Sequence, residues 1–365
     1  MAERPLRLGI VGANPTLGWA PRTHLPAIMG LPEVELTAVC TTKEQSAKES
    51  AEKFDAHKAY WNYKDLIADP DVELVDVCVR VPYHYDIVMA ALEAGKDVYC
   101  EWPLAANVKQ AEDIVNLAEK KGVRTMVGLQ SRGSPSLHHM HNLITSGWIG
   151  KVVYVNMTHL GGGLLATRGA DATWRGDKAN GANTMTIAGG HSVDALQWVV
   201  EPFTEVAGIV DTLAPEWPMR DGGTFHATAP DHVAFTGRLE NGGVAQVTIA
   251  SVPSHATGFK LQVYGSEGTL VASGGQVQVT AVNLQGAQAT DKELRDIAVP
   301  DTLRWVPSSV PEGSPVHFGQ MLSRFAESIR QNKAVAPTFA DALRNHRLLD
   351  AVERASQTHA AVKVS

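Results

Sequence analysis

Short apolar runs alternate with longer amphipathic segments along the first third of the chain. The apolar runs are residues 6–13, 34–41, 72–82, 96–103 and 123–130. Helix-forming segments separate them, and several of these segments end in Gly or in Asp-Pro, which terminate helices. Strands separated by helices of this length require right-handed crossover connections. The pattern therefore predicts a doubly wound parallel sheet over residues 1–132.

The pattern changes after about residue 132. Strand-like runs with alternating apolar positions now follow one another closely, at residues 151–160, 205–213, 232–239, 243–252, 259–266, 268–273 and 276–283. Helix patterns at 136–150, 191–201, 317–332 and 339–359 can cover such a sheet. We expect residues 133–365 to form a second α/β domain, with a large, open and mostly antiparallel sheet, that binds substrate and mediates oligomerisation.

Composition and patterning add further expectations. A chain of 365 residues is long enough for two domains, and a net charge of −7 argues against nucleic acids and membrane surfaces as partners. No apolar stretch is long enough to span a bilayer, and the N-terminal residues lack the features of a secretory signal. Three cysteines without ligand-like spacing favour buried thiols in a reducing, cytoplasmic setting. Apolar alternation on many strands predicts a homodimer, or a tetramer built from dimers.

The loop after the first strand reads Gly-Ala-Asn-Pro-Thr-Leu-Gly. Gly12 directly follows the strand, which suits the tight turn that brings backbone close to a pyrophosphate at a helix N-terminus. Asn14 occupies the position of a second glycine, and Asn tolerates positive φ better than most residues. We expect Gly12, Asn14, Thr16 and Leu17 to contact a dinucleotide, although the same segment also fits a plain strand–helix corner.

The second predicted strand ends in Thr41, Thr42 and Lys43. A site that prefers NAD(H) usually has an acidic residue here, which binds the ribose diol. Two hydroxyls and an ammonium suit a 2′-phosphate better, so NADP(H) is favoured and NAD(H) remains possible. The alternative is that Lys43 is a solvated residue in the first turn of a helix.

Two further strand ends are expected to face the same cofactor crevice, because the carboxyl ends of parallel strands bind ligands in doubly wound folds. After the third predicted strand come Val81, Pro82, Tyr83 and His84. Tyr83 or His84 could stack on a nicotinamide or move a proton, or these residues could simply form the wall of the cleft.

The fourth predicted strand ends in Glu101, Trp102 and Pro103. Proline cannot donate a hydrogen bond to a sheet and restricts the residue before it, which predicts a sharp bend there. We expect Glu101 and Trp102 to contact the cofactor.

His191 is the principal acid–base candidate, because it follows two glycines at the start of an amphipathic helix. The alternative is a structural histidine. His138 and His141 lie one helical turn apart, but no further ligand at metal-binding spacing accompanies them, so no metal site is expected.

Taken together, these residues resemble the Gfo/Idh/MocA (glucose–fructose oxidoreductase / inositol dehydrogenase / MocA) family over essentially the whole chain. The resemblance implies an N-terminal Rossmann domain followed by an α/β domain with an open sheet. Family members usually carry Glu-Lys-Pro after the fourth strand, and the lysine contacts substrate and assists proton transfer. Here Glu101 and Pro103 match, and Trp102 replaces the lysine.

A second family motif, Asp-x-Gly-x-His-x-x-Asp, is similar to residues 187–194. Gly189, His191 and Asp194 match it, but Ile187 stands in place of the first acid. The segment Thr-Trp-Arg that ends at Arg175 also resembles a family segment, which implies that Arg175 reaches cofactor or substrate. Gln130 falls on the strand that usually leads into the substrate cleft.

The long first loop and the two replacements are similar to one branch of the family, that of the fungal galactose-regulon repressor and its oxidoreductase-like relatives. The resemblance implies an NAD(P)-dependent oxidoreductase acting on a sugar, polyol or related hydroxyl or carbonyl compound. His191 would be its proton shuttle, assisted by Tyr83, His84 or Arg175. The first alternative is a dinucleotide-binding regulator without catalysis. The second is an NAD-dependent enzyme that cleaves glycosides.

Overall fold

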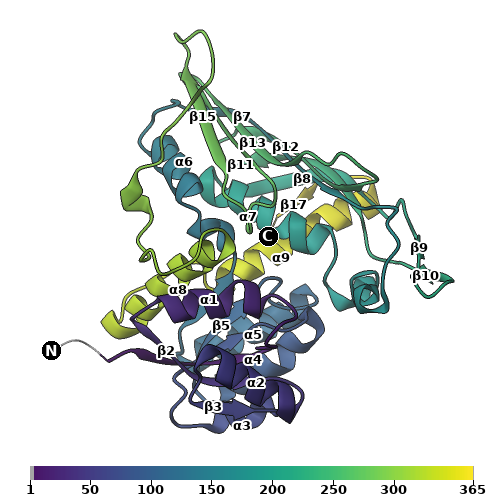
Figure 1. Cartoon of the computed structure of the whole chain (residues 1–365). Coiled ribbons are helices and arrows are strands. Elements are labelled where there is room, and N and C mark those ends of the chain that lie inside the picture. Colours follow the sequence, from purple (N-terminus) through teal and green to yellow (C-terminus); the bar gives the residue numbers. More distant parts are fainter. Residues whose placement is uncertain (1–3, 365) are drawn as a thin grey trace. The chain divides into compact units, whose positions relative to one another are not determined.

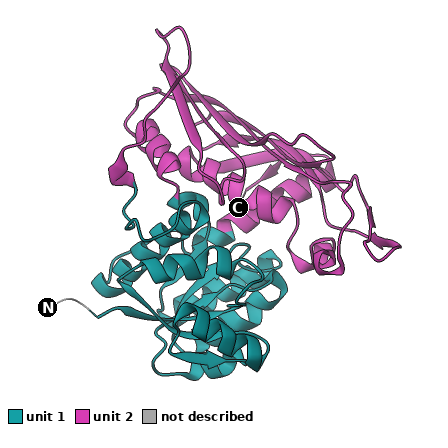
Figure 2. Ribbon diagram, viewed as in Figure 1, with its two compact units in different colours: residues 1–133, 304–343 teal, residues 134–303, 344–365 magenta. Residues whose placement is uncertain are grey.

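A computed structural model describes residues 4–364 of the chain. Residues 1–3, which belong to the N-terminal segment considered for a secretory signal, lie outside the described part. The chain forms two compact units (Figure 2). Unit 1 comprises Met1–Gly133 and Arg304–Leu343, and unit 2 comprises Ser134–Leu303 and Arg344–Ser365. The chain first passes from unit 1 to unit 2 after Gly133, and the sequence placed the domain boundary after residue 132. The return of residues 304–343 to unit 1 was not expected, because an amphipathic helix does not reveal which sheet its apolar face covers.

Unit 1 contains a six-stranded sheet in the order β3-β2-β1-β4-β5-β6. Strands β2, β3 and β5 of this sheet are labelled in Figure 1. Its strands are β1 (Leu6–Val11), β2 (Val34–Cys40), β3 (Lys58–Tyr60), β4 (Leu74–Val77), β5 (Asp97–Glu101) and β6 (Thr125–Gly128). All neighbouring strands pair in parallel, which confirms the predicted doubly wound sheet. The pattern missed β3, because three half-buried residues give no apolar run.

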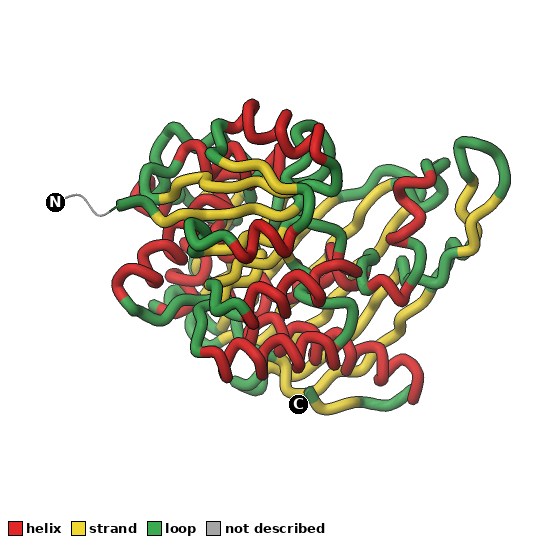
Figure 3. The backbone as a smooth tube through the Cα atoms, turned by 90° about the horizontal axis from the view of Figure 1, so that it is seen from below, coloured by secondary structure: helices red, strands yellow, loops and turns green. Residues whose placement is uncertain are grey.

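Helices pack on both faces of this sheet (Figure 3). They are α1 (His24–Gly30), α2 (Glu44–Phe54), α3 (Tyr63–Ala68), α4 (His84–Glu93), α5 (Val108–Lys121) and α8 (Ser314–Gln331). The side chains of Asn62 and Asn107 cap α3 and α5 by accepting hydrogen bonds from backbone N–H groups of the first turn. No helix within residues 4–364 is long and apolar enough to cross a membrane.

Helix α8 belongs to unit 1 because its apolar residues complete the core there. Phe318, Leu322 and Phe325 are fully buried among the apolar side chains of β1 and α1, in the same cluster as Leu8 and Leu25. Burying a side chain of this size stabilises a fold by about 1.5–3 kcal/mol. The C-terminal segment is therefore an integral part of the unit 1 core.

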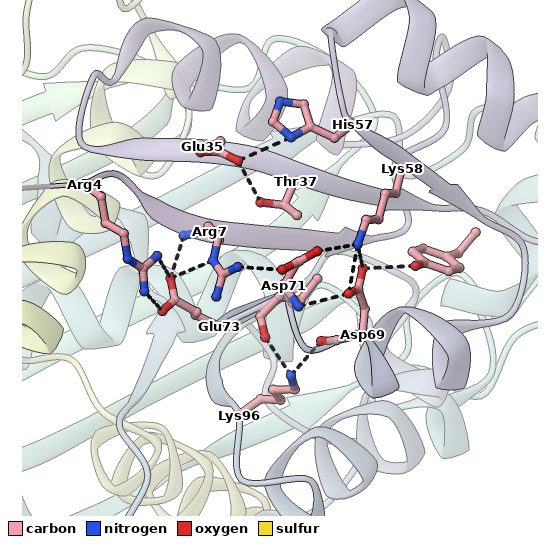
Figure 4. Close-up of polar contacts among 12 residues, drawn as sticks. Arg4, Arg7, Glu35, Thr37, His57, Lys58, Asp69, Asp71, Glu73 and Lys96 are labelled. Atoms are coloured by element: carbon pink, nitrogen blue, oxygen red, sulfur yellow. Dashed lines mark hydrogen bonds and ion pairs between the residues drawn. The ribbon is translucent and has the colours of Figure 1, made fainter.

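Charged side chains form a network at the amino ends of β1, β3 and β4 (Figure 4). Lys58 Nζ lies 2.9 Å from Asp69 and 2.7 Å from Asp71, and Arg7 binds Asp71 at 2.7 Å and Glu73 at 3.4 Å. Hydrogen bonds and ion pairs to arginines lower the pKa of Glu73 to about 2, although partial burial opposes the shift. This network lies at the sheet edge opposite the carboxyl ends of the strands, and we interpret it as structural.

The three cysteines are free and buried in unit 1, as predicted. Burial raises the pKa of Cys40 to about 12 and that of Cys78 to about 11. Thiols with such pKa values carry very little thiolate at neutral pH and are unreactive.

Unit 2 contains a nine-stranded sheet in the order β16-β15-β14-β13-β7-β12-β11-β8-β17. Its strands are β7 (Val152–Gly162), β8 (Phe203–Asp211), β11 (His232–Leu239), β12 (Val244–Val252), β13 (Gly258–Gly265), β14 (Gly268–Gly274), β15 (Asn283–Gln288), β16 (Arg295–Asp296) and β17 (Val362–Lys363). A separate hairpin consists of β9 (Glu216–Pro218) and β10 (Thr224–His226). Within the described strands of this nine-stranded sheet, only the β7–β12 pair is parallel, which confirms the predicted mostly antiparallel sheet.

The prediction of a strand over residues 276–283 was wrong. The backbone turns there, and the carbonyl oxygen of Gln276 accepts hydrogen bonds from the N–H groups of Val279 and Thr280, both at 2.9 Å. Val277 and Val282 are buried, so the apolar positions belong to a turn that inserts into the core. Alternation over a short segment does not distinguish these two arrangements.

Helices α6 (Pro135–Thr145), α7 (Gly190–Val199) and the second part of α9 (Phe339–Thr358) belong to unit 2. Helices α6 and α7 pack through aromatic rings, since His141 stacks on Trp198 at 5.1 Å and His138 meets the same indole edge-on at 4.7 Å. These two histidines therefore serve helix packing. Within residues 4–364 no group of three or more His, Cys, Asp or Glu side chains could hold a metal ion.

Candidate functional site

The backbone turns sharply at Gly12, directly after β1. Its φ is +101°, and a Cβ built there would lie 2.0 Å from the carbonyl oxygen of Cys78, which follows β4. The N–H groups of Gly12 and Ala13 donate to the carbonyl oxygen of Cys40 at 2.9 and 3.1 Å. The loop is thus fixed against the ends of β2 and β4, and only glycine fits at this point.

Asn14 orders the rest of this loop through its side chain. Its Oδ1 accepts hydrogen bonds from the N–H groups of Thr16 at 3.0 Å and Leu17 at 2.8 Å. Asn14 is absent from the described non-glycine residues at positive φ, so the expected glycine-like conformation was wrong. Gly18 adopts the positive φ instead, at +94°, while Asn14 forms an Asx turn.

A cavity of about 660 Å³ lies at the carboxyl ends of β1, β2 and β4 in unit 1. Its lining includes six of the predicted cofactor or catalytic residues: Gly12, Asn14, Thr41, Thr42, Lys43 and Tyr83. The other unit 1 candidates are not among its lining residues, namely Thr16, Leu17, Val81, Pro82, His84, Glu101, Trp102 and Gln130. Most of the predicted residues that line the cavity therefore follow the first two strands, β1 and β2.

Hydroxyl groups and an ammonium surround the end of β2. Thr41 Oγ1 lies 2.7 Å from Ser46 Oγ and donates to the carbonyl oxygen of Lys43 at 2.9 Å. Thr42 and Lys43 are exposed and line the cavity. The carboxylate in this lining, that of Asp86, comes from α4 and not from the end of β2. The donor set at this point suits a phosphate group.

Tyr83 and His84 are neighbours in sequence but lie in different environments. The Tyr83 side chain is 61% exposed at the cavity. His84 is buried, with Nδ1 2.8 Å from the carbonyl oxygen of Pro103 and Nε2 3.1 Å from that of Val79. Burial lowers the pKa of His84, so the ring is neutral. His84 connects the segment after β5 to the segment after β4, and its role is to fix this corner.

The predicted bend after β5 is confirmed. The Trp102–Pro103 peptide bond is cis, and Glu101 and Trp102 are almost completely buried. An indole has a single N–H donor and no group that titrates, so Trp102 can shape a site but cannot transfer a proton.

Glu101 belongs to a buried polar network that the sequence analysis missed. His24 Nδ1 lies 2.6 Å from Asp76 Oδ2, and His24 Nε2 lies 2.9 Å from Glu101 Oε1. The amide of Gln130 donates to the same Glu101 oxygen at 2.6 Å, and the His24 ring stacks on Phe318 at 3.8 Å. Burial opposes the charged form of His24, but the carboxylates of Asp76 and Glu101 raise its pKa well above the usual value. His24 is therefore an imidazolium between two carboxylates.

In unit 2, His191 lies at the start of α7, where a π-helical turn (η6, Met185–Gly189) leads into the helix. The side chain is buried, and its Nδ1 has no hydrogen-bond partner among the described residues. Burial, together with the neighbouring His159, lowers the pKa of His191 to about 3. Ile187, one turn earlier, offers no carboxylate. The imidazole is therefore neutral at physiological pH.

His159, on β7, is a second buried imidazole that the sequence analysis missed. Ser192 Oγ donates to the carbonyl oxygen of Ala188 at 2.7 Å and lies 2.7 Å from His159 Nδ1. His159 must therefore donate through Nδ1, which leaves Nε2 as an acceptor. Burial lowers the pKa of His159 to about 4. Its place in an alternating strand pattern suggested only a core position.

A cavity of about 420 Å³ lies in unit 2 and is lined by His159, Ile187 and the predicted residue Arg175. It also contains Arg168, whose guanidinium lies 4.0 Å from the centre of the Trp217 ring. Burial and the positive charge of Arg175 lower the pKa of Arg168. The described geometry thus provides a cavity of about 660 Å³ in unit 1 and a smaller cavity of about 420 Å³, lined in part by polar side chains, in unit 2.

Comparisons with known proteins agree with this architecture. Residues 6–129 match the family described as "Oxidoreductase family, NAD-binding Rossmann fold", and residues 137–271 match the "GFO/IDH/MocA C-terminal domain". The chain is 32% identical to "Dehydrogenase aclE" of Aspergillus oryzae over 77% of this chain and 80% of that protein. It is 30% identical to the "Galactose/lactose metabolism regulatory protein GAL80" of Saccharomyces cerevisiae over 66% of this chain and 59% of that protein.

Solved structures with the same fold include both kinds of relative. A super-repressor mutant of Gal80p from Saccharomyces cerevisiae has a TM-score of 0.87 at 24% identity, covering 99% of this chain and 98% of that chain. Levoglucosan dehydrogenase in complex with NADH and levoglucosan has a TM-score of 0.87 at 23% identity, covering 99% of each chain. The chain belongs to the Gfo/Idh/MocA family of oxidoreductases with an NAD-binding Rossmann fold.

Proposed function

We propose that the chain is an NAD(P)-dependent oxidoreductase that interconverts a hydroxyl and a carbonyl group on a sugar, polyol or related compound. The observation that carries this proposal is the loop at Gly12, where backbone lies against the ends of β2 and β4 beside a cavity of about 660 Å³. When bound, the dinucleotide supplies the hydride acceptor or donor. The protein must hold it, orient the substrate and move one proton.

Residues of unit 1 fit the dinucleotide. Gly12 allows the backbone approach that a pyrophosphate needs, and the Asn14 side chain keeps the following amides in place. Thr41, Thr42 and Lys43 line the cavity at the end of β2, which supports the proposal because doubly wound folds bind the ribose at the end of this strand. With no carboxylate at the end of β2, we propose a preference for NADP(H) over NAD(H).

His191 is the proposed proton shuttle. Its imidazole is neutral and its Nδ1 has no partner among the described residues, so it can accept a hydroxyl proton during substrate oxidation. A pKa of about 3 makes it a weak base, because no carboxylate replaces Ile187. We expect turnover to be slower than in relatives with an acid at this position, and we propose that Tyr83 and Arg175 assist through hydrogen bonding.

A regulatory protein that binds a dinucleotide without turnover is the second candidate. Trp102 and Ile187, which cannot titrate, favour it. The relative GAL80 is named as a regulatory protein, whereas the relative aclE is named as a dehydrogenase. We favour the enzyme because His191 is retained and the unit 2 cavity offers polar groups to a small molecule.

We also propose that the protein is a cytoplasmic homodimer, or a tetramer built from dimers, through the outer face of the unit 2 sheet. This face is amphipathic: Tyr154 stacks on Tyr264 at 5.9 Å and donates to Gln246 at 3.1 Å, while Asn156 donates to Gln262 at 3.0 Å. Aromatic and amide side chains of this kind are typical of interfaces. A monomer in light scattering at micromolar concentration would contradict this assembly.

The function is tested on the purified chain in two steps. The co-purifying dinucleotide is released by heat and identified by mass spectrometry, and NAD(P)H is then followed at 340 nm with polyols, aldoses and sugar acids. The proposal predicts a bound nicotinamide dinucleotide and turnover on at least one compound. A bound dinucleotide without turnover on any compound would support the regulatory protein. No dinucleotide binding at all would overturn both.

A further inference from the structure

The charged groups of the unit 2 cavity do not balance. Its lining contains Arg168, Arg175 and Asp231, together with His159. Burial keeps His159 neutral, with a pKa of about 4, so two guanidinium groups face a single carboxylate. A cavity wall with excess positive charge and limited access to water favours an anion.

The carboxylate of Asp231 is already used within the protein. Its Oδ1 accepts from the N–H of Leu213 at 2.8 Å and lies 2.6 Å from His232 Nδ1, and its Oδ2 accepts from the N–H of Ala214 at 2.9 Å. Asp231 thus orders the segment after β8, and it makes no ion pair with either arginine of the cavity among the described contacts.

Arg168 is fixed in place by its surroundings. Its two terminal nitrogens donate to the carbonyl oxygens of Ala166 at 2.8 Å, Gly163 at 3.0 Å and Leu164 at 3.1 Å. The guanidinium also lies over the Trp217 ring. Arg168 therefore contributes a fixed positive charge, whereas most of its donors are occupied.

Arg175 differs from Arg168 in this respect. It is exposed at the cavity, and within residues 4–364 no hydrogen-bond or ion-pair partner is found for its guanidinium. The neighbouring hydroxyls of Thr184 and Ser251, 3.0 Å apart, are partners for the hydroxyl groups of a small molecule. An arginine with all its donors available is suited to bidentate binding of a carboxylate or phosphate.

We infer that the unit 2 cavity selects a polyhydroxylated substrate that carries an anionic group, with Arg175 as the specificity-determining residue that binds this group. The inference rests on the proposed function, because it names the substrate class of the same protein. A sugar acid and a sugar phosphate share the required chemistry, and the measurement below distinguishes them.

The test is isothermal titration calorimetry on the full chain saturated with its dinucleotide. Galacturonate and gluconate are the carboxylate ligands, glucose 6-phosphate is the phosphate ligand, and galactose and galactitol are the neutral controls. Arg175→Ala is compared with Arg238→Ala, an exposed arginine of β11 that does not line this cavity. We expect the anionic class to bind about tenfold tighter than the neutral compounds, a difference typical of one charge-assisted contact.

Arg175→Ala should weaken binding of the anionic compounds about tenfold more than binding of the neutral compounds and so remove the preference, whereas Arg238→Ala should keep it. Tighter binding of the phosphate than of the carboxylates would support the inference and identify the source of the anion. Equal binding of anionic and neutral compounds, or an equal loss for both classes in Arg175→Ala, would overturn it. The same samples distinguish failure of this inference from failure of the proposed function. Turnover on neutral polyols alone would support the enzyme and overturn the anion preference. Preferential binding of anions without turnover on any compound would support the anion preference and overturn the enzyme.

Discussion

The imidazole of His24 lies 2.6 Å from the carboxylate of Asp76, and neither side chain has any exposed surface. A buried charge is tolerated only when it is paired, and here Glu101 supplies a second carboxylate at 2.9 Å. This arrangement connects α1, β4 and the end of β5, so it fixes the corner at which Glu101 and Trp102 lie.

Replacing His24 by Gln should destabilise the protein by about 3–5 kcal/mol at pH 6, because two buried carboxylates lose their cation. The raised pKa of His24 means that its contribution is fully present below pH 6.5 and is lost as the pH rises through the folded-state pKa. The gap between the wild-type protein and His24→Gln in denaturant unfolding should therefore shrink at alkaline pH. A gap that grows with pH would contradict the assignment, and the double variant His24→Gln/Asp76→Asn should recover part of the loss.

Acid should destabilise unit 2 through its buried neutral histidines. Burial lowers the pKa of His191 and His346 to about 3 and that of His159 to about 4. Folded pKa values below the unfolded value give stability that is present above pH 6.5 and is lost as the pH falls. Between pH 6 and pH 5, His191→Gln should reduce the slope of unfolding free energy against pH by about 1.4 kcal/mol per unit. The exposed His226→Gln variant is the control, and equal slopes for His191→Gln and the wild-type protein would contradict the burial of a neutral imidazole.

Gly12→Ala should weaken dinucleotide binding by at least about tenfold. The new Cβ would collide with the carbonyl oxygen of Cys78 at 2.0 Å, in addition to the strain of positive φ. Gly18→Ala is the matched control, because Gly18 also has positive φ but no atom lies within 4 Å of its Cβ position. Calorimetry should show a loss of at least about tenfold for Gly12→Ala and a smaller effect for Gly18→Ala. Equal effects would mean that strain, and not the close approach, determines binding.

If Lys43 binds a 2′-phosphate as proposed, Lys43→Ala should weaken NADP⁺ binding by about tenfold and NAD⁺ binding by less than about twofold, because only NADP⁺ carries that phosphate. Lys48→Ala controls for general charge, because Lys48 lies on α2, the helix that begins directly after Lys43, and pairs with Glu44 at 2.8 Å. If Lys43→Ala weakened both dinucleotides equally, the preference for NADP(H) would have to come from another residue.

Much of the fold could be predicted because it follows from short-range patterns. The five longer strands of unit 1 and the mixed sheet of unit 2 produced clear periodicity, and Gly12 carried the turn after β1. The return of α8 to unit 1 could not be predicted, since its apolar face fits any partner of matching shape.

The site was predicted less completely, because its interactions join residues far apart in sequence. His24 and Asp76 are separated by 52 positions. One signal was nevertheless available: a carboxylate in the otherwise apolar strand that contains Asp76 must find a partner when buried. His159 gave no such signal, because a histidine at an alternating position is compatible with a plain core.

The proposed role of His191 in moving the proton of a hydroxyl–carbonyl interconversion is tested by comparing kcat/KM of the wild-type protein and His191→Ala at 340 nm. Dinucleotide affinity is measured on the same samples by calorimetry. We expect His191→Ala to lose at least about a hundredfold in kcat/KM, typical for removal of a general acid or base, with dinucleotide affinity unchanged. Full activity of His191→Ala would contradict it.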